Sequence, residues 1–349
     1  MLKKTPEYTT IYSSRIGRDG LCFKGCFNFT KKIIVLALVV LLSFFILGCK
    51  KTNSYSATAQ DQITAGDSVL QETDSKMKTL FARAETGDSE AQLELALCYD
   101  NGEGVDEDDE EAVKWYRLAA EQGSAEAQNK LGVCYGKGYG VEKNEKEAVK
   151  WFRLAADQGH AKAQKNLGVC YDDGLGVDEN DKAALIWYGL AADQNYAEAQ
   201  FLLGTCYYDG EGIGQNYEIA VKWYRLAAEQ GLAEAQNALG LCYDKGCGVS
   251  QNLSEAIKWY RLAAEQGFAK AQNNLAVCYH AVDENDEEAV KWYRLAAEQG
   301  HTIAQYNLGI CYKRGRGVDE NEKEAVKWFR IAAEQGYAKA YEQLRDMGY

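Results

Sequence analysis

Tryptophan recurs along this chain at a fixed spacing, and that spacing constrains the fold more than any other feature. The seven tryptophans are separated by 36, 36, 36, 36, 33 and 36 residues: Trp115, Trp151, Trp187, Trp223, Trp259, Trp292 and Trp328. One class of cysteine keeps the same interval: Cys98, Cys134, Cys170, Cys206, Cys242, Cys278 and Cys311. A repeat of this length predicts stacked helical hairpins, which bury their apolar faces only against one another.

Each unit contains two segments with helical periodicity. In the second segment of the first unit, Trp115, Tyr116 and Ala119 share an apolar arc about 160° wide. Lys114 and Arg117 lie on the opposite, charged side. The chain holds a single proline, which agrees with a helical class. We expect Trp223, in the middle unit, to be buried against both neighbouring units.

Paired glycines separate the two segments in six of the units: Gly102 and Gly104, Gly138 and Gly140, Gly174 and Gly176, Gly210 and Gly212, Gly246 and Gly248, Gly315 and Gly317. Because the pair recurs at the same helix junction, it indicates turn geometry rather than a phosphate-binding loop. The sixth unit drops three residues here and reads His280-Ala281-Val282.

The unit resembles a known repeat family. It reads Ala-x-Ala-Gln-x-x-Leu-Gly-x-Cys-Tyr, then Gly-x-Gly-Val, then Ala-Val-Lys-Trp-Tyr-Arg-Leu-Ala-Ala-Glu-Gln-Gly, and it is similar to the Sel1-like repeat, a relative of the tetratricopeptide repeat. The resemblance covers residues 88–336. It implies an all-α, right-handed superhelical αα-hairpin solenoid of seven Sel1-like repeats with terminal capping half-repeats. It also implies a concave face and a role as an adaptor or scaffold.

The boundaries follow from this resemblance and from the spacing. The seven repeats are expected at 88–123, 124–159, 160–195, 196–231, 232–267, 268–300 and 301–336. A capping helix is expected on each side of them, at 76–87 and at 337–349.

The first 49 residues have the features of an export signal. Lys31 and Lys32 precede an apolar run at 33–47, and a secretory signal combines a positive flank with such a run. The tetrad Ile-Leu-Gly-Cys that ends at Cys49 resembles a bacterial lipobox. The resemblance implies export through residues 1–48, lipidation of Cys49 and a lipid anchor in the bacterial cell envelope, facing the periplasm or the exterior. A single-pass membrane anchor is the alternative.

Residues 49–75 are polar and small, which predicts a flexible tether. The net charge of the chain is −13; residues 1–49 carry seven basic and two acidic side chains, so the remainder carries −18. An acidic body disfavours nucleic acid as a partner, because phosphates need lysine and arginine.

No catalytic, cofactor-binding or metal-binding residues are predicted, and we do not expect an enzyme. The three histidines, His160, His280 and His301, lie in different units without metal-ligand spacing. The acidic loop at 178–181 lacks the ligand order of an EF-hand, so its acids are read as helix-dipole partners.

The periodic cysteines are interpreted as buried apolar packers. Equivalent helices of neighbouring repeats are about 8–10 Å apart, whereas a disulfide needs Cα atoms closer than about 7 Å. Of the remaining thiols in the repeats, only Cys247, in a loop, is expected to be exposed.

The resemblance also raises one enzymatic alternative. A few cysteine-rich Sel1 proteins bind β-lactams, and they pair a cysteine late in one helix with a cysteine eight residues further on. The matching positions here hold Ala120 and Gln128, and Ala156 and Gln164, so that framework is missing. A β-lactam-binding or β-lactamase-like envelope enzyme and a passive structural spacer remain the alternatives to a scaffold.

The positions that the repeat leaves variable are the candidates for partner binding. They precede the core leucine of each first helix, where the resemblance places the concave face, and asparagine offers both a donor and an acceptor to a peptide backbone. The candidates before these leucines are Asn129, Asn166, Asn237, Asn274 and Asn307. Phe201, Leu202 and Tyr208, in the fourth repeat, are the candidates for an apolar anchor. Solvation or packing between repeats is the alternative for each. The predicted function is a membrane-tethered scaffold that binds proteins or peptides.

Overall fold

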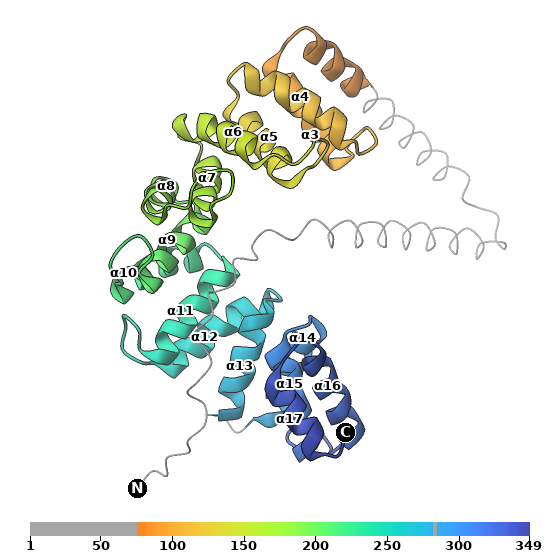
Figure 1. The fold of residues 1–349 in the computed structure, drawn as a ribbon, viewed down its shortest axis with the longest axis vertical. Coiled ribbons are helices and arrows are strands. Elements are labelled where there is room, and N and C mark those ends of the chain that lie inside the picture. Colours follow the sequence, from red (N-terminus) through yellow and green to blue (C-terminus); the bar gives the residue numbers. More distant parts are fainter. Residues whose placement is uncertain (1–74, 282–284) are drawn as a thin grey trace, which may run out of the picture. The chain divides into compact units, whose positions relative to one another are not determined.

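Helical hairpins follow one another in chain order through the whole described part of the protein (Figure 1). The computed structural model describes residues 75–281 and 285–349. The export segment, Cys49 and all but the last residue of the predicted tether therefore lie outside the described residues. A helix at residues 75–85 comes first. The remaining helices are α3 (Ser89–Asn101), α4 (Asp109–Glu121), α5 (Ala125–Lys137), α6 (Glu145–Asp157), α7 (Ala161–Asp173), α8 (Asp181–Asp193), α9 (Ala197–Asp209), α10 (Tyr217–Glu229), α11 (Ala233–Lys245), α12 (Leu253–Glu265), α13 (Ala269–Ala281), α14 (Asp286–Glu298), α15 (Thr302–Arg314), α16 (Glu322–Glu334) and α17 (Ala338–Asp346).

Each helix contacts the helix before it and the helix after it, as in an αα-hairpin solenoid. The odd-numbered helices α3–α15 are the first helices of the seven repeats, and α4–α16 are the second helices. The helix at 75–85 buries Leu80 and Ala84 against the first repeat, and α17 buries Ala340 and Leu344 against the last. These two helices cover the apolar ends of the stack, which solenoids require.

Local sequence signals begin and end the helices. A side chain with an N-cap oxygen precedes every second helix; Asn180, for example, accepts a hydrogen bond from the N–H of Ala183 at 3.0 Å. Six of the first helices end at a glycine in the left-handed region, with φ between 61° and 84°. These glycines are the first members of the Gly-x-Gly pairs.

The second glycine of each pair has a different role, which concerns the contact between repeats. A Cβ atom on Gly212 would lie 2.7 Å from the carbonyl carbon of Asp181, the first residue of α8 in the preceding repeat. The same relation holds for four other loops: Gly140 with Asp109, Gly176 with Glu145, Gly248 with Tyr217, and Gly317 with Asp286. The pair therefore combines a turn residue with a residue that lets neighbouring backbones touch.

The aromatic residue after each tryptophan fills the core. Tyr116, Tyr188, Tyr224, Tyr260 and Phe329 are at most 1% exposed, and a Cβ on the facing glycine of the first helix would collide with the ring in four of these repeats. The prediction that Trp223 is buried was wrong: of the seven tryptophans only Trp259 and Trp328 are buried, at 8% exposed. The others are half-buried at the edge of the helix pair, because the residue after them lies closer to the centre of the apolar arc.

Trp223 shows what the half-buried position does. Its own hairpin packs around Tyr224, whereas the indole packs against the cluster between α8 of the preceding repeat and α9, which contains Tyr188 and Leu203. The tryptophan thus helps to join two repeats and does not fill the centre of one.

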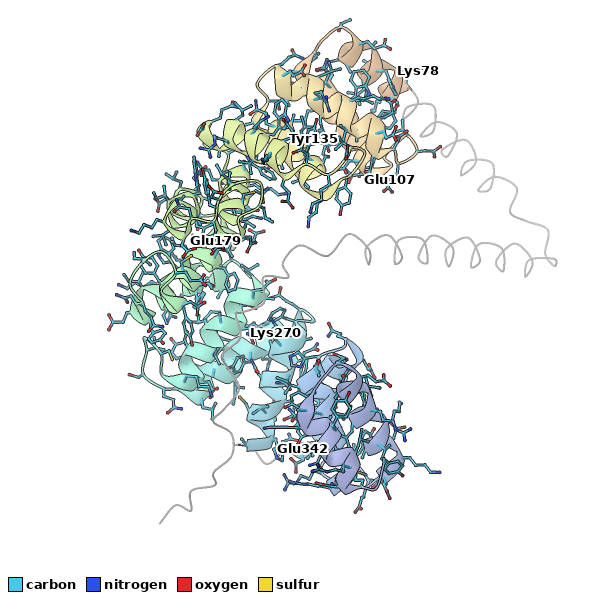
Figure 2. All side chains as sticks on the ribbon, in the orientation of Figure 1. Lys78, Glu107, Tyr135, Glu179, Lys270 and Glu342 are labelled. Carbon is cyan, nitrogen blue, oxygen red and sulfur yellow. The ribbon has the colours of Figure 1, made fainter. Side chains whose placement is uncertain are left out.

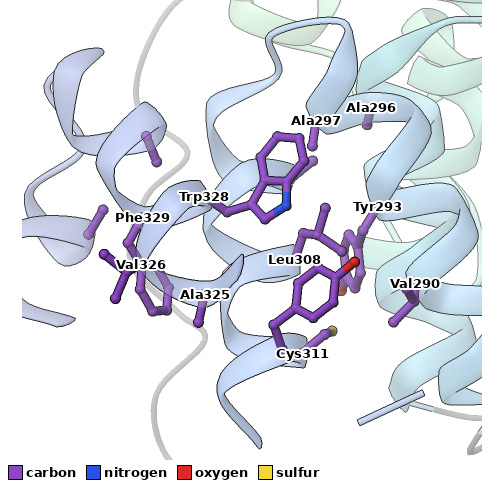
Figure 3. Packing of buried hydrophobic residues seen from close by; sticks show 14 of the residues in the cluster. Val290, Tyr293, Ala296, Ala297, Leu308, Cys311, Ala325, Val326, Trp328 and Phe329 are labelled. Carbon is purple, nitrogen blue, oxygen red and sulfur yellow. The ribbon is translucent and has the colours of Figure 1, made fainter. Parts of the chain in front are cut away.

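Six of the seven periodic cysteines are buried in the core clusters, which confirms their interpretation as packers: Cys134, Cys170, Cys206, Cys242, Cys278 and Cys311. Figure 3 shows Cys311 near Leu308 and Tyr293 in the last cluster. Burial raises the pKa of Cys170, Cys242 and Cys311 to about 12. Cys98 is only half-buried, and so is Cys247, which was expected to be the exposed thiol.

A ladder of buried glutamines runs through the stack. In each first helix the glutamine donates to a carbonyl in the last turn of the preceding helix at 3.0–3.3 Å. Its own oxygen accepts from the glutamine at the end of the second helix of its repeat at 2.7–2.9 Å. The recurring Ala-Gln and Glu-Gln-Gly or Asp-Gln-Gly motifs are therefore two halves of one network. Gln128 and Ala120, which replace the cysteine pair of the β-lactam-binding relatives, form one such bond at 3.0 Å.

Candidate interaction surfaces

Three of the predicted binding asparagines bond to an asparagine of the preceding repeat. Asn166 donates to Asn129 at 2.9 Å, and Asn274 donates to Asn237 at 3.0 Å. Asn307 makes the same bond, at 3.2 Å, to Asn273, which the sequence did not single out. These amides therefore belong in part to the contact between repeats.

The asparagines differ in how far they reach the surface. Asn129 is 0% exposed, so a partner cannot touch it directly. Asn166 is half-buried, and it uses one of its two N–H groups, with its carbonyl oxygen unpaired among the described residues. Amide groups with remaining capacity are suited to bind a peptide backbone.

The predicted apolar anchor lies in the fourth repeat, on α9. The rings of Phe201 and Tyr208 both contact Tyr224, with centroid distances of 5.7 and 6.2 Å. Tyr208 also contacts Tyr217 at 4.9 Å, and burial raises the pKa of its hydroxyl. Leu202 packs instead on the cluster that forms between α8 of the preceding repeat and α9. The structure thus brings Phe201 and Tyr208 together and separates Leu202 from them.

We call the seven half-buried candidates the first-helix set: Asn166, Phe201, Leu202, Tyr208, Asn237, Asn274 and Asn307. All of them lie on first helices between α7 and α15.

The second helices carry a feature that the sequence reasoning missed. Leucine three residues after the tryptophan is exposed in six repeats: Leu118, Leu154, Leu190, Leu226, Leu262 and Leu295, at 39–48%. The signal was present in the recurring Arg-Leu and Gly-Leu dipeptides. Leucine at this position does not enter the core, so it gives the second helices a periodic apolar surface.

A second missed feature joins consecutive repeats through arginine and tyrosine. The arginine two residues after the tryptophan donates to the tyrosine hydroxyl 18 residues further on; Tyr135, labelled in Figure 2, accepts from Arg117 at 2.7 Å. The other pairs are Arg153 with Tyr171, Arg225 with Tyr243, Arg261 with Tyr279, and Arg294 with Tyr312. In each pair the guanidinium also lies over the tyrosine ring, at 5.6–5.9 Å.

Histidine and acidic side chains serve local structure. His160 and His301 cap first helices, and each accepts from a backbone N–H at 3.2 Å. His280 pairs with Asp286. Across residues 75–281 and 285–349 no cluster of three or more histidine, cysteine or acidic residues has the geometry of a metal site.

An open polar hollow lies between the start of α6 and the loop of the third repeat. Lys143, Glu145 and Asp178 are among the residues that line it. The residues that line it include neither a cysteine nor a histidine, and Lys143 pairs with Glu145 at 2.8 Å.

The chain was compared with models of protein families. The model of the Sel1 repeat matches seven consecutive segments: 89–124, 125–160, 161–196, 197–232, 233–268, 269–301 and 302–337. The chain belongs to the Sel1 repeat family.

Two solved structures resemble this Sel1 repeat protein. One is the crystal structure of a protective antigen present in uropathogenic Escherichia coli strains and displaying an SLR fold; it is 38% identical with a TM-score of 0.67, and the match covers 78% of this chain and 59% of the antigen. The other is a Sel1 repeat protein from Oxalobacter formigenes, 34% identical with a TM-score of 0.64, covering 80% of this chain and 81% of that one. The match thus spans less than two thirds of the antigen's length. A comparison with curated proteins finds no match.

Among the described residues of this Sel1 repeat protein, every helix is too short or too polar to cross a bilayer.

Proposed function

We propose that this Sel1 repeat protein is a scaffold that binds protein or peptide partners through the first-helix set. The observation that carries the proposal is the unused hydrogen-bonding capacity of half-buried amides such as Asn166, next to the aromatic contact of Phe201 and Tyr208. An extended peptide needs both: amides for its backbone and an apolar contact for a side chain. Sel1 repeat proteins are in general scaffolds for protein interactions, which supports this function.

The test uses a photo-crosslinking amino acid at position 237, on α11, in the full chain in living bacterial cells. Asn237 only accepts a bond from Asn274, and the Asn274 amide that loses this acceptor is half-buried and can donate to water instead. We expect discrete protein adducts from this position. The matched control places the same amino acid at the exposed loop residue Glu142, which should give none. Adducts from neither position, or equally from both, would contradict binding at the first-helix set.

We further propose that a lipid on Cys49 tethers the scaffold to the bacterial envelope, facing the periplasm or the exterior. The support is the apolar run at 33–47 and the tetrad that ends at Cys49. The resemblance to a protective antigen agrees with exposure to antibodies. Cys49→Ala should move the protein to the soluble fraction or leave an unprocessed precursor. Palmitate labelling that persists in this variant would refute the lipid anchor.

A further inference from the structure

Helix α8 departs from the pattern that every other second helix follows. The residue before the tryptophan is lysine in the six other repeats: Lys114, Lys150, Lys222, Lys258, Lys291 and Lys327. The residue two after the tryptophan is arginine in the same six: Arg117, Arg153, Arg225, Arg261, Arg294 and Arg330. In α8 these positions hold Ile186 and Gly189. Helix α8 therefore lacks both of the cationic side chains that the other second helices carry at these positions.

The substitutions leave an apolar, uncovered face. Ile186 is 62% exposed and Leu190 is 44% exposed, and residues four apart lie side by side on a helix. Gly189, three residues after Ile186, lies on the other side of Ile186 from Leu190, and a Cβ atom there would meet nothing within 4 Å. The surface is thus open where an arginine side chain lies in other repeats.

The same change removes a bond between repeats. At five junctions an arginine donates to the tyrosine 18 residues ahead, at 2.6–2.7 Å in four of them. Gly189 takes the place of that arginine opposite Tyr207, whose hydroxyl has no hydrogen bond to any other described residue. Tyr207 is half-buried. The Tyr207 hydroxyl can therefore accept a hydrogen bond from a donor that the described residues do not supply.

The charge around this face is negative. Helices α8 and α9 carry four carboxylates against one cation: Asp181, Asp193, Glu198 and Asp209 against Lys182. The preceding pair, α6 and α7, carries five acidic and five basic side chains. A cationic group is therefore favoured at α8–α9, and an anionic lipid surface is disfavoured.

We propose that the face formed by Ile186, Gly189, Leu190 and Tyr207 docks a segment of another protein that carries arginine among aliphatic side chains. The arginine donates to the Tyr207 hydroxyl and lies over its ring, as the chain's own arginines do at the other junctions. The aliphatic side chains cover Ile186 and Leu190. The partner thus supplies in trans the residue that this repeat lacks. The inference rests on the proposed scaffold function, and it places a partner at a second surface.

The test is selection of a random 16-residue peptide display library on the full chain, purified in a mild detergent. We expect enriched peptides to share arginine within an aliphatic pattern. Their binding should weaken at least about tenfold on the double variant I186K/G189R, which gives α8 the residues of the other repeats and so should fold. Leu262→Lys, which changes an exposed leucine of α12, is the matched control and should leave binding unchanged.

Replacing the peptide's arginine with citrulline separates charge from shape. We expect binding to weaken at least about tenfold, because citrulline keeps the shape and loses the cation. Equal binding to wild type and I186K/G189R, or equal binding of the citrulline peptide, would overturn the inference. Peptides that lose binding on Phe201→Ser but not on I186K/G189R would overturn it while supporting the first-helix set. A library without enriched binders would count against both proposals.

Discussion

Substitution of the second glycine in a Gly-x-Gly loop tests the idea that this residue joins the repeats. Gly212 in the fourth repeat has a φ of +69°, and a Cβ atom there would lie 2.7 Å from the carbonyl carbon and oxygen of Asp181. Gly231, in the same repeat, has a φ of +93° and nothing within 4 Å of its Cβ position. The two alanine variants therefore share the backbone strain and differ in the collision.

The magnitude follows from this difference. The left-handed conformation costs alanine about 1–2 kcal/mol at either position. At Gly212 the Cβ must also gain about 0.8 Å to reach an ordinary contact near 3.5 Å. Overpacking of this kind costs about 1–3 kcal/mol. Gly212→Ala should therefore lower the free energy of unfolding by about 2–5 kcal/mol, and Gly231→Ala by about 1–2 kcal/mol.

Urea denaturation followed by circular dichroism at 222 nm measures both variants. Because repeat stacks are stabilised by nearest-neighbour contacts, the slope of the transition must be compared as well as its midpoint. A lower slope for Gly212→Ala alone would show that the third and fourth repeats had uncoupled, as the argument expects. Losses that agree within about 0.5 kcal/mol, with unchanged slopes, would refute the role of Gly212 in joining the repeats.

Three further measurements test the core, the thiols and the half-buried His301. Tyr224→Ala should lower the free energy of unfolding by about 3–5 kcal/mol, as is typical of a buried aromatic residue. Trp223→Ala should lower it clearly less, since Tyr224 is 1% exposed and Trp223 is half-buried. The reverse order in urea denaturation would show that the assigned core is wrong. A bulky maleimide should react in the native protein with the half-buried Cys247 and Cys98 before any other thiol of the repeats. If mass spectrometry finds the buried thiols equally modified, the packing of these cysteines in the core is contradicted. Burial lowers the pKa of His301 to about 4, below its ordinary 6.5, so the stability that the neutral imidazole contributes is complete above pH 6.5 and is lost as the pH falls toward 4. Over this window the free energy of unfolding of the wild type should fall by about 2–3 kcal/mol more than that of His301→Asn, which keeps a capping side chain. Parallel curves of unfolding free energy against pH would exclude this contribution of His301.

Much of this architecture was determined by the sequence alone, because the same pattern of residues occurs in seven repeats. The 36-residue interval, the helical arcs and the glycine junctions were enough to predict an αα-hairpin solenoid. Local signals such as the N-cap Asn180 and the C-cap glycines act over a few residues, so they can be read directly from the sequence.

Other features depended on distances that a one-dimensional pattern does not contain. The periodicity placed tryptophan and the following tyrosine on the same arc, and only packing decided that Tyr224 fills the centre while Trp223 lies at the junction. Asn129 matched the pattern of a surface residue, yet stacking of the next repeat buries it beneath Asn166.

The gap opposite Tyr207 also needed the tertiary structure. The sequence shows that Gly189 replaces a recurring arginine, but the partner of that arginine lies 18 residues further along and in another repeat. The sequence determines which side chains recur, because local helix geometry fixes their faces. The stack decides which of them meet, because contacts between repeats depend on how closely two backbones approach.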